Sequence, residues 1–386
     1  MARKPTPAED AIRRVYLDAE RALQDVVADE VRRVTLAEDD EIEVAKTNGG
    51  RRVRRAAQEV SLRLARGSLS LVLSAITAAG EQGIGEAMRQ LGKVRWQRSP
   101  RFEIAHRSML DAIAAAVVDR ISPVHSAILR TTDDAYREVV ARVLPRMAAG
   151  TDERLHATQR ALWALLDRGI TGFVDSAGRR WALTSYVEMA VRTGAARAAV
   201  EAQLAATRDA GQDLVIVNGS GDRCPRCRPW HGKILSISGS RTALVEHPWI
   251  DGQYETVTTD GTVREAQAAG LLHPQCRCSL ATYTHGVTRV PPPARDNGQY
   301  EARQRQRAIE RQIRAWKERE ATALTPTAKR QARKGLAAAQ KRMREHLAAN
   351  TDLRRNIRRE QIGAGNLPDA DLRARVTASG RGPLGD

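Results

Sequence analysis

The first 210 residues carry apolar side chains at helical spacing. Between residues 9 and 36 the apolar positions recur every three or four residues, from Ile12 to Val34, and charged residues fill the opposite side. Further runs with this spacing cover about 52–78, 104–118, 124–143, 152–166 and 185–210. Residues 1–210 are therefore predicted to be a helical N-terminal domain.

Two groups of small residues interrupt this helical pattern. Thr47-Asn-Gly-Gly50 separates the first two runs, and Gly80, Gly83 and Gly85 follow the second. Glycine inside a helix costs more conformational entropy than other residues. The sequence therefore predicts a helix break at both places.

The pattern changes at Gly211. Residues 214–217 are a short apolar run that ends at a glycine-rich turn, which predicts a buried strand, and residues 233–238 alternate as a second strand would. The sequence then predicts a strand or hairpin arm and a short helix, at 256–261 and 263–272. Residues 211–290 are therefore predicted to form a small α+β module.

Residues 291–386 are predicted to be a basic helical C-terminal region. Pro291-Pro-Pro293 indicates a stiff linker, and a narrow apolar seam on a charged helix follows from Tyr300 to Leu324. Thr325-Pro326 ends that helix, and helical spacing resumes up to Asn350. We expect a helical hairpin with a basic exterior, a third segment at 352–361 that carries four arginines, and a loosely ordered tail after Gly363.

Composition limits the core and the partners. Hydrophobic residues make up 42% of the chain but aromatic residues only 4%, which favours helices packed through Ala, Leu, Val and Ile over a sandwich or barrel. The net charge of +17 indicates a polyanionic partner. The apolar runs are too short for a membrane span and no apolar segment follows the basic N-terminus, so we expect no membrane partner and no secretory signal.

All four cysteines lie in two close pairs, Cys224-Pro-Arg-Cys227 and Cys276-Arg-Cys278. A stable disulfide is disfavoured in a reducing cytoplasm, whereas four thiolates from two short loops can complete a tetrahedral zinc site. Cys224, Cys227, Cys276 and Cys278 are therefore predicted to hold a structural zinc, for which His231 or His273 could replace one thiolate. The predicted fold class is mainly α, with a small zinc-stapled α+β module between helical N- and C-terminal regions.

Two other interpretations use the same cysteines, as buried free thiols or as a redox-active pair. A redox pair usually begins a helix after a strand, whereas Cys224 follows the turn at 218–222, and redox chemistry leaves the second pair unexplained. His231 and His273 could also be acid–base catalysts. A packed or metal-orienting role fits them better, because no carboxylate lies at a spacing that would orient either ring.

The segments around the cysteines resemble a known module. Gly221-Asp-Arg-Cys-Pro-Arg-Cys-Arg-Pro-Trp-His-Gly-Lys233 and Leu272-His-Pro-Gln-Cys-Arg-Cys278 are similar to the C-terminal module of phage head morphogenesis proteins, both the Mu F-like minor head proteins and the phage minor capsid protein 2 family. The charged helix from Tyr300 to Leu324 is also similar to the segment that follows the module in minor capsid protein 2 relatives. The resemblance covers about 215–350. Some of those relatives end in Cys-Arg-His, whereas Cys278 is closer to the Mu F-like form, which leaves the subfamily open.

The resemblance implies a minor virion component, present in few copies, that acts with the portal and capsid proteins during head assembly in the host cytoplasm. The helical domain at 1–210 would then supply the portal or capsid contacts. The resemblance also implies a location in the phage head and contact with DNA, with no catalysis and no small-molecule substrate. Two rival hypotheses remain. One is a phage-delivered, nuclease-like enzyme that uses His231 or His273, and the other is a zinc-containing DNA-binding regulator.

Most of the excess positive charge lies near the C-terminus. Residues 297–386 contain 21 Lys and Arg against 10 Asp and Glu. No base-reading motif accompanies them, so we expect sequence-independent, salt-sensitive contact with packaged DNA, or docking to an acidic portal or scaffold surface. The candidate nucleic-acid contacts are Arg303, Arg307, Arg311, Arg314, Lys329, Arg330, Arg333, Lys334, Lys341, Arg342, Arg354, Arg355, Arg358 and Arg359.

Overall fold

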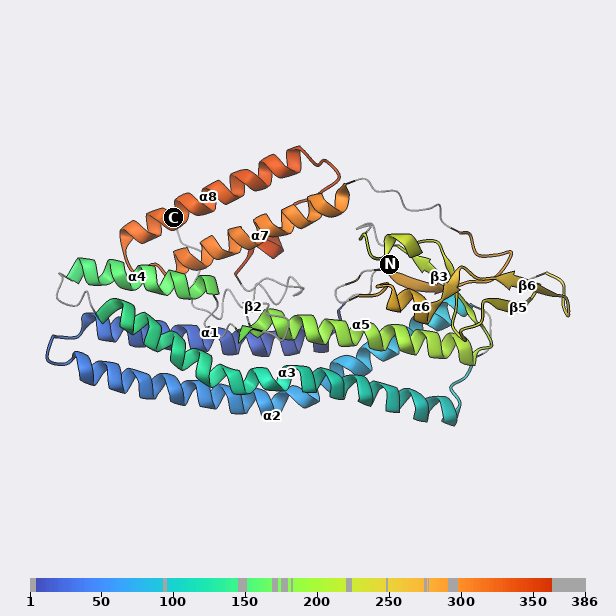
Figure 1. The fold of residues 1–386 in the computed structure, drawn as a ribbon, viewed down its shortest axis with the longest axis horizontal. Helices are drawn as coiled ribbons and strands as arrows, with labels where there is room; N and C mark the ends of the chain where they lie inside the picture. The colour runs from blue at the N-terminus through green and yellow to red at the C-terminus, as the bar shows by residue number, and fades with distance from the viewer. Residues whose placement is uncertain are drawn as a thin grey trace. The chain divides into compact units, whose positions relative to one another are not determined.

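The chain is mainly helical, with a small region of strands after residue 213 (Figure 1). The computed structural model describes residues 5–92, 96–144, 151–168, 173–174, 180–181, 183–219, 224–247, 249–273, 276, 278–290 and 298–362. The predicted linker at 291–293 and the tail after Gly363 lie outside these residues. The chain divides into two compact units: unit 1 comprises Met1–Ile12, Gly67–Ile121 and Val187–Glu301, and unit 2 comprises Arg13–Arg66, Ser122–Tyr186 and Ala302–Asp386.

Five long helices form most of the chain before residue 210. They are α1 (Pro7–Leu36), α2 (Ile42–Leu91), α3 (Pro100–Val143), α4 (Thr151–Arg168) and α5 (Leu183–Asp209). A short antiparallel pair, β1 (Phe173–Val174) and β2 (Arg180–Trp181), comes between the last two. The helices predicted at 9–36, 152–166 and 185–210 are confirmed. The two predicted at 104–118 and 124–143 are one helix, α3, which continues through Pro123.

The predicted helix breaks in α2 are wrong. Thr47-Asn-Gly-Gly50 and the three later glycines all lie inside this 50-residue helix. A Cβ atom at Gly49 would overlap the hydroxyl group of Tyr136, and one at Gly83 would overlap the carbonyl oxygen of Ala199. One at Gly80 would lie 2.8 Å from Leu110 Cδ2. These glycines permit close approach of neighbouring helices, and that packing outweighs their poor helix propensity.

Two helices are long and apolar enough to cross a membrane, judged by length and composition alone. Windows of 18 residues in α2 and α3 reach mean hydropathies of 1.2 and 1.4, with 33% and 39% of each window buried. Both helices are therefore more apolar over 18 residues than the sequence analysis expected. The core helix of a soluble protein passes the same test, so the finding is weak support for a membrane span.

The core of unit 2 includes apolar side chains from α1, α2, α3 and α4. Val27, Val31 and Val34 of α1 pack with Val53 of α2 and with Tyr136 and its neighbours on α3. Glu30 is also buried, and its carboxylate accepts hydrogen bonds from Arg52 Nε at 2.7 Å and Nη2 at 2.6 Å. Pairing with this arginine offsets much of the cost of burying the charge.

Unit 1 contains a four-stranded sheet in the order β7-β4-β3-β8. The strand predicted at 214–217 is confirmed as β3 (Leu214–Asn218), which pairs antiparallel with β4 (Ile234–Ser236) and with β8 (Ser279–Thr282). β7 (Gly261–Thr262) pairs parallel with β4 and leads into α6 (Val263–Ala268). Thr262 and Glu265 form a capping box at the N-terminus of α6. A separate hairpin joins β5 (Thr242–Glu246) to β6 (Tyr254–Thr258).

The predicted C-terminal hairpin is confirmed as α7 (Gln299–Ala321) and α8 (Pro326–Ala348). Ile313, Ala339 and Met343 form its buried seam. Thr325 caps α8, because its hydroxyl group accepts from the amide of Ala328 at 3.1 Å, and Pro326 occupies the first turn where no amide hydrogen is needed.

Residues 352–361, part of the C-terminal region predicted to be helical, form no α-helix. The segment contains a single 3₁₀ turn, Ile357–Glu360. Side chains of α7 bind its backbone instead: Gln306 Nε2 donates to the carbonyl of Arg354 at 2.8 Å, and Arg314 donates to the carbonyl of Arg359. These bonds satisfy carbonyl groups that a helix would otherwise pair internally.

Two glycines of α2 provide a matched test of this packing. Gly83→Ala should destabilise unit 1 by about 1–3 kcal/mol, because the added methyl group overlaps the Ala199 carbonyl of α5. Gly85→Ala should leave stability unchanged or raise it by up to about 1 kcal/mol, because a Cβ there meets nothing within 4 Å and alanine favours the helix. Calorimetric unfolding of both variants checks this; equal destabilisation would contradict the close approach of α5.

Candidate metal centre and basic surface

The β3–β8 pairing brings the two cysteine pairs together. Asn218 at the end of β3 lies opposite Ser279 at the start of β8. The first pair follows β3 and the second immediately precedes β8, so both arrive at the same end of the sheet. A pair of loops separated by about fifty residues of chain is therefore positioned by backbone hydrogen bonds alone.

Two tight turns orient the metal-ligating side chains. The amides of Cys227 and Arg228 both donate to the carbonyl of Cys224, at 3.1 and 2.9 Å, and a 3₁₀ turn from Arg228 to Trp230 then delivers His231. The amide of Cys276 donates to the carbonyl of His273 at 2.8 Å. Each turn thus places a histidine beside its cysteines. The residues at 220–223, 274–275 and 277 lie outside the described part of the chain.

The sulfur and imidazole atoms form two groups that share Cys227. In the first, the ligand atoms of Cys224, Cys227 and His273 all lie within 4.8 Å of one another, and in the second those of Cys227, Cys276 and Cys278 do so. Cys224 Sγ is 3.2 Å from His273 Nε2, and Cys227 Sγ is 3.4 Å from Cys276 Sγ. His231 Nε2 adjoins the second group, 3.3 Å from Cys278 Sγ.

Burial and hydrogen bonding distinguish the sulfurs. Cys227 is fully buried among apolar side chains that include Val215, Leu235 and Leu280, whereas the other three cysteines are half-buried. Hydrogen bonding between the Cys227 and Cys276 side chains lowers the pKa of Cys276 and raises the pKa of Cys227. The two side chains are therefore coupled through a direct contact of 3.4 Å between their sulfur atoms.

The four predicted cysteine ligands are thus brought together, and the cluster could hold a metal ion. The sequence analysis expected one tetrahedral set of four thiolates, whereas the structure shows two overlapping groups with a histidine at each. Both histidines contact sulfur through Nε2, at 3.2 Å for His273 and 3.3 Å for His231, so both lie within reach of a metal ion bound by the cysteines. Zinc itself, and the ligand set, stay predictions.

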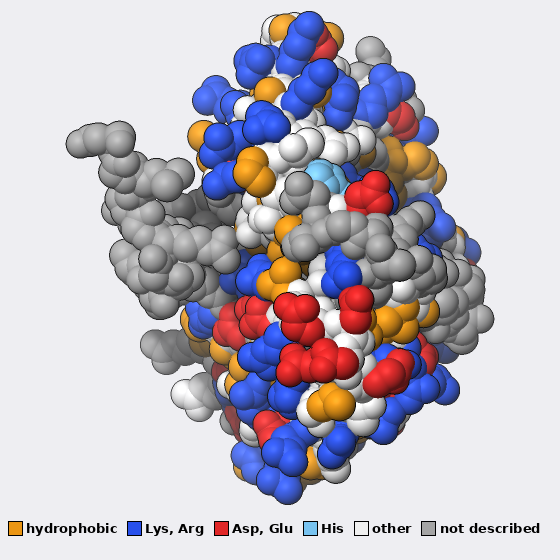
Figure 2. All heavy atoms as spheres, turned by 90° about the vertical axis from the view of Figure 1, so that its left-hand side faces the viewer, with side chains coloured by type: hydrophobic (Ala, Val, Ile, Leu, Met, Phe, Trp, Pro, Cys, Tyr) orange, Lys and Arg blue, Asp and Glu red, His pale blue; other side chains and the backbone are white. Residues whose placement is uncertain are grey.

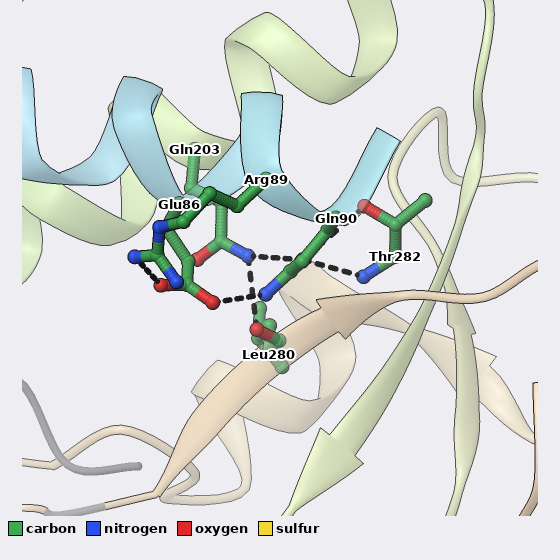
Figure 3. Close-up of polar contacts among 6 residues, drawn as sticks. All are labelled: Glu86, Arg89, Gln90, Gln203, Leu280 and Thr282. Carbon is green, nitrogen blue, oxygen red and sulfur yellow. Dashed lines mark hydrogen bonds and ion pairs between the residues drawn. The ribbon is translucent and has the colours of Figure 1, made fainter. Parts of the chain in front are cut away.

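Two glutamines attach the strand region to the helices within unit 1 (Figure 3). Gln90 Oε1 of α2 accepts from the amide of Thr282 in β8 at 2.9 Å and from Gln203 Nε2 of α5 at 3.0 Å. Gln203 Nε2 also donates to the carbonyl of Leu280 at 2.9 Å. The strand that follows the second cysteine pair is therefore fixed to α2 and α5. Sequence reasoning missed both residues, because one buried glutamine on a helix gives no periodic signal.

The basic candidates divide into two groups by their environment. Seven cations of α8 are exposed: Lys329, Arg330, Arg333, Lys334, Lys341, Arg342 and Arg344, of which the sequence analysis missed only the last. The same helix carries a single acid, Glu345, and Arg333 also pairs with Glu320 of α7 at 2.8 Å. Figure 2 shows Lys and Arg side chains gathered at the top of the view, where α8 lies in Figure 1.

The remaining candidates, on α7 and in the segment after α8, are mostly engaged within the protein. Arg355 forms a bidentate pair with buried Glu360, with both distances at 2.7 Å, and Arg359 lies 3.8 Å from Glu310. Arg314 binds a backbone carbonyl, and Arg303 and Arg307 are half-buried. Arg311 and Arg354 are exposed, and the side chain of Arg358 lies outside the described residues. Most of the predicted contacts that are exposed and described therefore lie on α8.

The glutamine contacts generate a further prediction. Gln90→Leu should lower the stability of the strand region by about 1–3 kcal/mol, because the buried amide of Thr282 loses its acceptor. Arg89→Ala is the matched control, since Arg89 is 71% exposed and pairs only across one helical turn with Glu86; its effect should stay within about 0.5 kcal/mol. Hydrogen–deuterium exchange of the β3 and β8 amides at increasing denaturant concentration measures both; equal effects would show that the Gln90 hydrogen bonds contribute nothing.

Comparison with known proteins assigns the family. The model of a family described as Phage minor capsid protein 2 matches residues 5–348. A protein of Lactococcus phage LL-H described as a structural protein is 25% identical over 251 residues, which span 60% of this chain and 63% of that relative's length. No solved structure matches. Because the family match extends over nearly the whole chain, from α1 to the end of α8, the chain belongs to the phage minor capsid protein 2 family.

Proposed function

We propose that the chain is a low-copy structural component of the phage head that associates with the portal and capsid proteins. The observation that carries this proposal is the family match, which includes the long helices, the cysteine-containing module and the C-terminal hairpin together. The relative described as a structural protein supports the same role. The chain would fold in the host cytoplasm and end in the virion, with its long helices supplying the contact surfaces.

We further infer that the cysteine cluster holds zinc in a structural role. Its donor set fits, because thiolate and imidazole are the ligands that zinc prefers in structural sites. The strand region has short strands, so a metal that joins its two loops would add stability that its small core lacks. When bound, zinc supplies crosslinks between the turn at 224–227 and the turn at 273–278. The chain's own residues hold those turns on β3, β8 and α6.

The surface of α8 supports contact with packaged DNA. Seven exposed cations against one acid on this helix leave a strong local excess of positive charge, and phosphate groups are the partner that such a surface attracts without reading sequence. An acidic protein surface would attract the same helix. Binding to DNA can be distinguished from binding to an acidic protein by measuring the affinity for DNA directly. If α8 contacts DNA, this affinity should fall strongly with salt for every DNA sequence, and it should fall when these cations are removed.

The virion role predicts that the chain is present in purified particles. Peptide mass spectrometry should find it at a few to some tens of copies per particle, measured against the major capsid protein. The infected-cell extract is the control. A chain abundant in the extract but missing from particles would contradict the proposal and favour a free regulator or an enzyme.

The DNA contact predicts a change in salt dependence. Replacing Lys329, Lys334, Lys341 and Arg344 by Gln should lower the slope of log affinity against log salt by about 0.9 for each phosphate group that the protein no longer neutralises. A control with the same charge change replaces the exposed Arg51, Arg55, Arg63 and Arg66 of α2 by Gln. Its slope should stay near that of the wild type. Equal changes of slope in the two variants would mean that net charge, rather than the α8 surface, governs binding.

A further inference from the structure

The cluster contains more donors than one structural zinc uses. Four cysteines and two histidines contribute six ligand atoms, and tetrahedral zinc takes about four. A single ion would therefore leave two of these side chains unligated beside it. The positions of the six donor atoms indicate that they form two metal-binding sets.

The distances describe two overlapping sets. Around tetrahedral zinc with metal–ligand bonds of about 2.0–2.3 Å, neighbouring donors lie roughly 3.4–3.8 Å apart. The contacts of 3.2 Å between Cys224 and His273, 3.4 Å between Cys227 and Cys276, and 3.3 Å between His231 and Cys278 are close to that spacing. The two groups within 4.8 Å have only Cys227 in common.

Cys227 is placed to bridge two ions. Its sulfur belongs to both groups and the residue is fully buried, whereas Cys224 and His273 lie on one side and Cys276 and Cys278 on the other. A thiolate has the lone pairs to bind two cations at once. His231 is held firmly as well, because a Cβ at Gly219 would overlap its ring, so the imidazole packs directly on that backbone.

Charge balance also favours two ions. Four thiolates with one Zn²⁺ carry two net negative charges, whereas two Zn²⁺ with neutral histidines make the cluster neutral. The side chains packed with the buried Cys227 are apolar and include Leu204, Val217, Val263 and Leu271, and an apolar environment penalises net charge. A neutral cluster suits this environment better than a dianionic one.

We propose that the cluster binds two zinc ions that share the Cys227 thiolate. Cys224, Cys227 and His273 hold the first ion, which keeps one position for a ligand from outside these six residues. Cys227, Cys276, Cys278 and His231 hold the second. This proposal rests on the zinc-binding part of the proposed function and replaces the single four-cysteine site that the sequence predicts.

Native mass spectrometry of the full chain, purified with zinc and passed through gel filtration, tests the stoichiometry. The wild type should retain two zinc ions per chain, and His273→Ala should retain one while it stays folded. His247→Ala, a histidine of the β5–β6 hairpin outside the cluster, should retain two. One ion in the wild type would overturn the two-ion cluster and leave structural zinc intact, whereas no ion would overturn both. Two ions in His273→Ala would overturn the assignment of the first site.

Cobalt titration tests the two-ion stoichiometry without any variant. The metal-free full chain should develop thiolate-to-Co²⁺ charge-transfer absorption up to two equivalents. Saturation at one equivalent would contradict the proposal. Cys227 contributes to both sites in the proposed cluster, so Cys227→Ser should lower the thiolate absorption of both equivalents, because each ion loses one of its thiolates and keeps the others. Loss from only one would show that Cys227 serves a single ion.

Discussion

The strand region of unit 1 brings together two cysteine pairs that are about fifty residues apart along the chain. β3 and β8 bring the pairs to one end of the sheet, and the turns at 224–227 and 273–276 aim sulfur and imidazole atoms at each other. The hydrogen bonds of Gln90 and Gln203 hold β8 of this sheet on α2 and α5. Backbone pairing of β3 with β8 positions the cysteine pairs, and the glutamine side chains attach the sheet to the helices.

Local patterns predicted the features that depend on nearby residues. The periodicity of α1, the seam of the α7–α8 hairpin and the apolar run of β3 were all predictable, as was the proximity of the cysteines. The continuity of α2 was not, because Gly83 is a helix breaker by propensity and a packing residue only once α5 lies against it. The division of the cysteines into two groups also depends on the pairing of distant strands.

The C-terminal hairpin uses its arginines in two ways. Arg314, Arg355 and Arg359 bind carbonyl or carboxylate groups and hold the segment after α8, so their charge is compensated within the protein. The cations of α8 lie opposite a seam of Ala, Met and Leu and face outward. A count of charged residues along the sequence does not separate these two groups of cations, because it does not show which side chains have partners within the protein.

The most direct test of the structural cluster is hydrogen–deuterium exchange on the full chain with and without its metal. Metal removal should release the amides of β3 and β8, including Val215, Val217 and Leu280, to exchange near the rate of an unfolded chain. The amides of α7 and α8, which belong to unit 2, should keep their protection. Unchanged protection in β3 and β8 after verified removal of the metal would show that the cluster does not hold this region together.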